Sequence, residues 1–167
     1  ANSKVIGRKL SINMERTIEE LNGTPCFDFE HQPPAKRQIY CTRSFGDKLT
    51  ELEPIEQAIS VYAARAAQKL REQKSLALSI HVFLHTSPCQ GNYVSRSMTA
   101  QLPYPTDDTR VISALARQCI KRQYQSGNRY MKAGIGLIEL TTKKHNQLDL
   151  FHAGQSIKSD RLMGTID

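Results

Sequence analysis

Between Gln38 and Leu140 the hydrophobic pattern alternates between two periods, and this succession limits the possible folds more than any other feature of the chain. A two-residue period typical of strands covers residues 38–45, 76–85, 93–102 and 130–140. A helical period covers residues 53–73 and 106–127, opened by Pro54 and by Thr106-Asp107-Asp108 respectively. The order is β-α-β-β-α-β. Two βαβ halves of this kind predict an α+β fold, a four-stranded antiparallel sheet with both helices on one face and the other face open.

The segments on either side of this pattern differ from it. Residues 1–23 have apolar side chains at helical spacing and a terminal Gly23, which predicts a short helical piece. Residues 24–37 contain three prolines and predict an extended linker. Residues 38–141 form the predicted domain, and residues 142–167 a polar C-terminal tail. The first residue is Ala rather than Met, so we expect the chain to be a piece of a longer protein whose helical domain ends at residue 23.

The charge and the cysteines restrict the partners and the compartment. The chain has 23 Lys and Arg against 16 acidic residues, a formal charge of +7, which suits the neutralisation of phosphates. Its 4 cysteines are scattered without a Cys-x-x-Cys pair, which indicates a reducing, cytoplasmic setting and argues against a zinc site. No apolar run approaches the roughly 20 residues of a membrane span, and no signal peptide opens the chain.

The predicted open face combines small hydroxyl side chains, glycines and cations. Its strands contribute Thr42, Ser44, Ser95, Ser97, Thr99, Lys132, Gly134 and Gly136, with Arg43, Arg96 and Arg129 nearby. Such a surface suits a sugar-phosphate backbone, because cations neutralise phosphates, hydroxyls hydrogen-bond to them and glycines let another backbone approach closely. It lacks the aromatic stacking pair of an RNA-recognition sheet, so we expect duplex binding without sequence readout. A polar face that only contacts solvent is the alternative.

The tail contains a second candidate binding element, Gln147-Leu148-Asp149-Leu150-Phe151. An amide followed by spaced apolar anchors has the form of a short linear docking peptide, and its flanks are polar. The alternative is that Leu148, Leu150 and Phe151 fold back as one more strand.

No catalytic group is evident. Asp107 and Asp108 are neighbours at a helix start and are explained as caps. His81 and His85 lie on one side of a strand but roughly 13 Å apart, too far to share a metal. A small enzyme on a ferredoxin-like sheet, with His81 or His85 as the acid–base residue, and a protein-interaction domain remain as alternatives.

Five segments, in order along nearly the whole chain, resemble the UmuC-type subunit of bacterial DNA polymerase V, a Y-family translesion polymerase. They are residues 15–23, 36–46, 107–110, 129–134 and 147–151. The resemblance implies the end of the thumb domain (1–23), a linker (24–37), the little finger domain (38–141) and a tail with a clamp-binding motif (142–167). In that family the little finger lies in the major groove of the primer-template and grips both backbones. Residues Thr42, Arg43, Ser44, Ser95, Arg96, Ser97 and Lys132 are then the expected DNA contacts.

The same resemblance implies partners and an activity for the longer protein. Gln147, Leu148, Asp149, Leu150 and Phe151 would bind the sliding clamp, and a UmuD′-type subunit and a recombinase filament would be further partners in SOS lesion bypass. The family's catalytic acids and Mg²⁺ belong to a palm domain that this sequence does not contain. We therefore expect no polymerase activity and no cofactor in this chain, although its parent would be a DNA polymerase.

Overall fold

The computed structural model describes residues 3–27, 34–87, 93–143 and 156–166, and the chain divides into two units, residues 1–34 and 35–167. The first unit contains α1 (Ser3–Lys9) and α2 (Ile12–Leu21), where the sequence indicated a single helical piece. Ser11 caps α2 by accepting a hydrogen bond from the backbone N–H of Met14. Leu21 is 82% exposed, so the apolar stripe of α2 is not buried within this unit.

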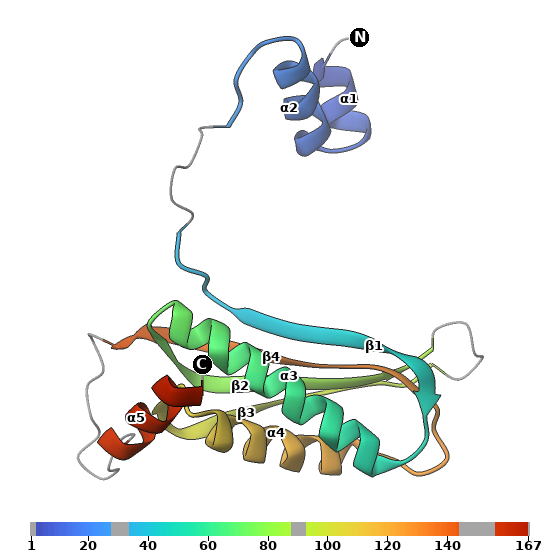
Figure 1. Cartoon of the computed structure of the whole chain (residues 1–167). Coiled ribbons are helices and arrows are strands. Elements are labelled where there is room, and N and C mark those ends of the chain that lie inside the picture. The colour runs from blue at the N-terminus through green and yellow to red at the C-terminus, as the bar shows by residue number, and fades with distance from the viewer. Residues whose placement is uncertain (1–2, 28–33, 88–92, 144–155, 167) are drawn as a thin grey trace. The chain divides into compact units, whose positions relative to one another are not determined.

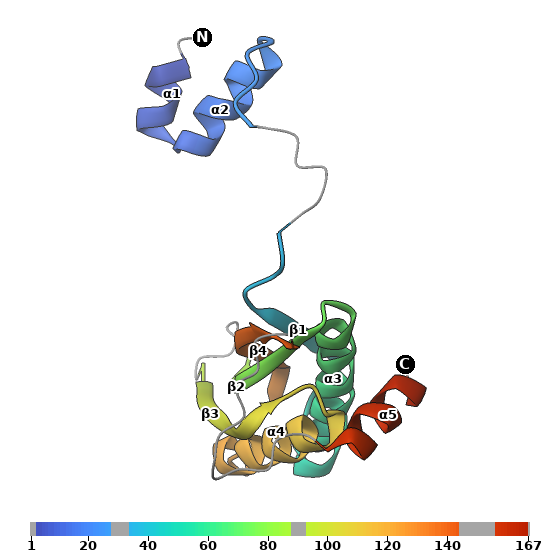
Figure 2. The same ribbon diagram turned by 90° about the vertical axis from the view of Figure 1, so that its left-hand side faces the viewer.

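The second unit has the predicted β-α-β-β-α-β order. Its elements are β1 (Ile39–Leu49), α3 (Leu52–Glu72), β2 (Ser75–Thr86), β3 (Ser95–Thr106), α4 (Thr109–Gln123) and β4 (Tyr130–Thr142), followed by α5 (Ile157–Ile166). The four strands form one antiparallel sheet in the order β1-β4-β2-β3, and α3 and α4 cover one of its faces (Figures 1 and 2). The α+β fold with one open sheet face is confirmed.

The core lies between the sheet and the two helices. The stripe of α3 that the periodicity indicated is buried, and α4 adds its own apolar stripe. From the sheet, Ile80, Val82 and Leu84 of β2 face the helices, with Ala133, Ile135 and Leu137 of β4. Burial of an aliphatic side chain of this size stabilises the fold by roughly 1.5–3 kcal/mol.

One stretch of β2 faces the opposite way from the prediction. Regular alternation through residues 76–85 puts Leu78 on the same side as Ile80 and Val82, but Leu78 is 37% exposed and Ala77 is fully buried instead. The change of side occurs at an irregularity in the pairing with β3, where Ala77 is opposite Thr106 and Ser79 is opposite Gln101, so that β3 has three more residues than β2 over this stretch. Ser79 donates a hydrogen bond to the carboxylate of Glu139 there.

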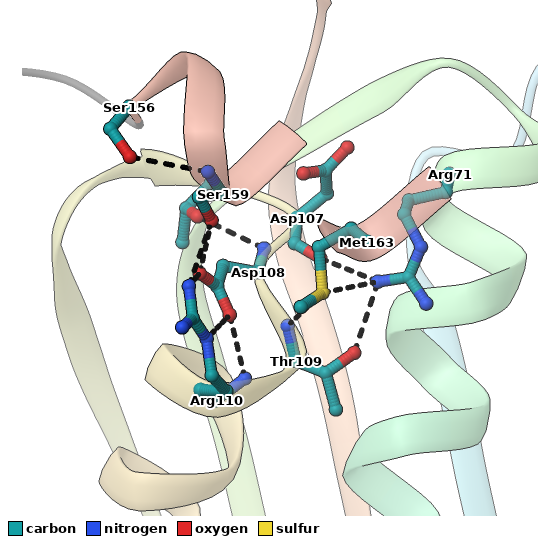
Figure 3. A network of polar contacts seen from close by, with 9 residues as sticks. Arg71, Asp107, Asp108, Thr109, Arg110, Ser156, Ser159 and Met163 are labelled. Carbon is teal, nitrogen blue, oxygen red and sulfur yellow. Dashed lines mark hydrogen bonds and ion pairs between the residues drawn. The ribbon is translucent and has the colours of Figure 1, made fainter. Parts of the chain in front are cut away.

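The C-terminal helix α5 was not predicted, and a buried polar cluster attaches it to the start of α4 (Figure 3). The Ser159 hydroxyl donates to the carboxylate of Asp108, which also accepts from the Arg110 backbone N–H at 2.8 Å and from its guanidinium at 2.7 Å. Burial by itself raises the pKa of Asp108, but hydrogen bonds from the Arg110 side chain, Ser159 and the Arg110 backbone lower it to about 2. Asp108 thus caps α4, as the sequence indicated, and anchors α5 as well.

A second group of contacts, through Asp160 and Met163, also holds α5. The side chain of Met163 is buried, and its sulfur lies 3.4 Å from the backbone N–H of Thr109 and 3.7 Å from the Arg71 guanidinium. Lys143, just after β4, forms ion pairs with Asp107 at 2.6 Å and with Asp160 at 3.4 Å. Both chain segments that adjoin residues 144–155 are therefore attached to the same domain. The docking peptide Gln147–Phe151 itself lies outside the described residues.

Candidate nucleic-acid interface

The open face consists of three rows of side chains that cross all four strands. The register of the sheet aligns Tyr40, Gly136, His81 and Thr99 in the first row, Thr42, Gly134, Phe83 and Ser97 in the second, and Ser44, Lys132, His85 and Ser95 in the third. Within the 35–167 unit, no described helix covers these rows (Figure 2). The structure thus brings together five of the seven residues proposed as DNA contacts: Thr42, Ser44, Ser95, Ser97 and Lys132.

The two glycines of the rows have a different role from the one inferred from the sequence. They were expected to let a ligand backbone approach closely. In the structure a Cβ at Gly134 would lie 2.5 Å from the ring of Phe83 and 2.6 Å from the Thr42 methyl group. A Cβ at Gly136 would lie 2.3 Å from the ring of Tyr40. The glycines therefore make room for side chains of neighbouring strands, which fill the centre of the face.

A line of aromatic rings crosses the face, and the sequence analysis missed it. The centroids of His81 and Phe83 are 6.0 Å apart, and those of Phe83 and His85 are 4.8 Å apart. Tyr40 extends the line at one end through His81, and Tyr93 stacks on His85 at the other. The signal was present in the alternation of His81, Phe83 and His85 opposite the core residues of β2. The open face therefore contains aromatic rings in addition to the hydroxyls, glycines and cations predicted from the sequence.

Arg43 and Arg96 do not lie on the open face. Arg43 is opposite Ala133 and Arg96 is opposite Leu84, and both partners are core residues. Their side chains therefore start from the helix-covered side of the sheet. Because β1 and β3 are its two edge strands, the two cations lie at opposite rims, where they are exposed and half-exposed respectively.

The positive charge of the open face lies in its third row, which contains Lys132. There Ser44, Lys132 and His85 line a hollow of about 390 Å³ together with Thr86, Tyr93 and Met131. Burial, then the positive charges of Lys132 and His81, lower the pKa of His85. The neutral form of His85 is thereby favoured, and Lys132 supplies a positive charge to this hollow.

The described residues contain no group of three or more His, Cys, Asp or Glu side chains arranged to hold a metal ion. Within the same part of the chain, no helix has the length and apolar character needed to cross a membrane. Asp107 is fully buried and paired with Lys143, so the two acids that the sequence explained as helix-start residues both have structural partners.

Comparison with known proteins places the chain among bacterial relatives. The protein ImpB of Salmonella typhimurium is 40% identical over 170 residues, a match that covers all of this chain and 40% of that protein. UmuC of the same species is 40% identical over 149 residues, covering 88% of this chain and 35% of UmuC, and MucB of Escherichia coli is 38% identical over 170 residues, covering 100% and 40%. The chain thus spans about two fifths of the length of the curated relatives it matches.

A solved structure has a similar fold. The insertion ternary complex of Dbh DNA polymerase matches with a TM-score of 0.54 and 7% sequence identity, covering 86% of this chain and 40% of that one. The model of the impB/mucB/samB family C-terminal domain matches residues 36–150, which include β1 to β4 and the docking peptide as far as Leu150. The resemblance inferred from the sequence motifs is confirmed, and the chain belongs to the impB/mucB/samB family.

Proposed function

We propose that this chain is the DNA-holding and clamp-docking C-terminal region of an error-prone translesion polymerase subunit that acts in lesion bypass during the SOS response. The observation that supports it best is the open face, with hydroxyl side chains on both edge strands, Lys132 between them and an arginine at each rim. The family membership and the fold shared with Dbh DNA polymerase agree with this function. Such a surface suits contacts to phosphates and sugars, which position a protein on DNA without reading its sequence.

The width of the sheet suits two phosphate backbones. The edge strands β1 and β3 are three strand spacings apart, which is roughly 14 Å. The major groove of B-DNA is roughly 12 Å wide. Arg43 at one rim and Arg96 at the other can therefore each reach the backbone on its own side, while Lys132 and the hydroxyls contact the phosphates nearest the sheet. In this arrangement Arg43 and Arg96 contact the DNA backbones although neither side chain lies on the open face.

The proposal also covers nucleotide transfer by the longer protein and its binding to the sliding clamp and other partners. Nucleotide transfer with Mg²⁺ would belong to the remaining part of a protein as long as the relatives. Gln147–Phe151 would bind the sliding clamp by placing Leu150 and Phe151 in an apolar groove. A UmuD′-type subunit and a recombinase filament are proposed as further partners, and the cytoplasm as the compartment.

Lys132→Gln tests the grip directly. It removes the cation of the three rows and is expected to weaken binding to a short primer-template duplex roughly tenfold or more, because a hydrogen bond to a charged group contributes about 1.5–3 kcal/mol net of water and about 1.4 kcal/mol corresponds to tenfold. The loss should be the same for duplexes of different sequence, as measured by fluorescence anisotropy. The control is Arg117→Gln, which removes the same charge from an exposed position on α4. Equal affinities for the two variants would contradict the assignment of the open face.

The line of rings supports a second candidate, binding of single-stranded nucleic acid by base stacking. Tyr40 and Tyr93, at its two ends, are 44% and 53% exposed, whereas the rings between them are only half-exposed. A competition between duplex and single strand of equal length decides between the candidates, since the open-face proposal requires preference for the duplex.

A further inference from the structure

A second hollow lies at the free edge of β1, and three cations surround it. Its volume is about 250 Å³, and four consecutive residues of β1, from Tyr40 to Arg43, form one wall. Tyr62, Arg65 and Lys69 of α3 form the other. These three are spaced i, i+3 and i+7, so they share one stripe of the helix, and the buried Tyr62 fixes that stripe against the sheet.

Within the described part of the chain, Arg43, Arg65 and Lys69 make no ion pair and no hydrogen bond from their side chains. Other cations of the domain do have acidic partners, as in Lys121 with Glu56 at 3.4 Å and Lys143 with Asp107 at 2.6 Å. Glu72, the next acid along this side of α3, pairs with none of the three. Cations held around one hollow repel each other, and a bound anion relieves that repulsion.

The backbone of β1 adds donors to the same place. Among the described strands, β1 pairs only with β4, so alternate N–H groups along its outer edge have no partner in that part of the chain. Amide groups of this kind, together with Arg and Lys, bind the oxygens of phosphates. The hollow is smaller than the roughly 300–1,000 Å³ of small-molecule sites, which favours a single phosphate with water over a whole nucleotide ligand.

The hollow is continuous with the open face, because Tyr40 and Thr42 belong to both. A DNA backbone that passes the β1 rim would reach the hollow directly. We propose that Arg43, Arg65 and Lys69 bind one phosphodiester group of that backbone, which extends the DNA contact around the sheet edge onto α3. This inference rests on the proposed DNA binding and adds helix residues that the open face does not include.

The decisive variant is Arg65→Gln with Lys69→Gln, which leaves the whole sheet unchanged. Both side chains are exposed and Gln is a good helix former, so α3 is expected to remain folded, as circular dichroism can verify. Loss of one phosphate contact should reduce the slope of log affinity against log salt by about 0.9 and weaken duplex binding several-fold at physiological salt. The matched control is Arg117→Gln with Lys158→Gln, which removes one Arg and one Lys from exposed positions on α4 and α5 and should leave the slope unchanged.

A titration of the unmodified chain with inorganic phosphate, followed by NMR, tests the hollow without DNA. Amide signals of residues 41–43, 65 and 69 should shift together, and the double variant should abolish the shift. If the unsubstituted chain binds duplex DNA and the double variant has the same slope of log affinity against log salt, this inference is overturned while the proposed function stands. If the unsubstituted chain does not bind duplex DNA at all, the proposed function is refuted instead. If poly-glutamate shifts these amide signals and phosphate does not, the inference is overturned in favour of an acidic protein partner.

Discussion

Replacing Leu150 and Phe151 together by alanine is expected to abolish binding to a purified sliding clamp. Each side chain, when fully buried in a partner's groove, contributes roughly 1.5–3 kcal/mol, so the pair accounts for an affinity difference on the order of 10²- to 10⁴-fold. Few other positions can contribute as much, because the flanks of this peptide are polar. Surface plasmon resonance with immobilised clamp provides the measurement.

The control for this variant is His152→Ala with Gln155→Ala, which changes the same tail outside the docking peptide and should retain clamp binding. Both variants should bind duplex DNA with the same affinity as the unsubstituted chain, since clamp docking and DNA binding involve separate residues. Clamp affinity that is unchanged by Leu150→Ala with Phe151→Ala would refute the docking proposal, whereas a parallel loss of DNA affinity would show that the two functions are not separate.

Asp108→Ala is expected to lower the free energy of unfolding of the 35–167 unit by about 2–4 kcal/mol. The variant removes the side-chain cap of α4, which contributes about 1 kcal/mol, and the buried carboxylate that binds Arg110 and Ser159. A pKa of about 2 in the folded chain, against an ordinary value of 3.8, corresponds to roughly 2 kcal/mol of stabilisation at neutral pH. Urea unfolding at pH 7 measures the difference.

The pH dependence of this difference has a definite sign. Because folding lowers the pKa of Asp108, the ionised carboxylate stabilises the fold fully above the unfolded value near 3.8. That contribution is lost as the pH falls from about 4 to about 2. The difference in free energy of unfolding between the unsubstituted chain and Asp108→Ala should therefore become smaller over this range. Asp47→Ala is the matched control, since Asp47 is exposed and makes no polar side-chain contact in the described structure. A difference in free energy of unfolding that stays constant over this pH range would show that Asp108 does not stabilise the fold through its charge.

Most of the fold could be predicted because its signals are local. The period of the apolar residues determined the order of strands and helices, and the pattern also placed Thr42, Ser44, Ser95, Ser97 and Lys132 on one face, where the structure has them. Each of these inferences depends only on which residues are adjacent in the sequence. Strand alternation then assigns the face.

The missed features depend on contacts between distant segments. The exposure of Leu78 occurs at an irregularity in the pairing with β3, which no pattern within β2 reveals. The helix α5 depends on Asp108 and Thr109, which lie 51 and 54 residues before their partners Ser159 and Met163. The basic hollow likewise needs β1 and α3 side by side, so Arg65 and Lys69 read as ordinary solvent-exposed helix residues in the sequence alone.

The salt dependence of duplex binding tests the central claim most directly, since a grip by cations on phosphates releases counterions in proportion to the contacts made. With Arg43, Arg96 and Lys132 each on one phosphate, a plot of log affinity against log salt concentration should have a slope of about −3 or steeper, and it should be equal for duplexes of different sequence. A duplex affinity that stays constant between roughly 50 and 200 mM salt would contradict the account.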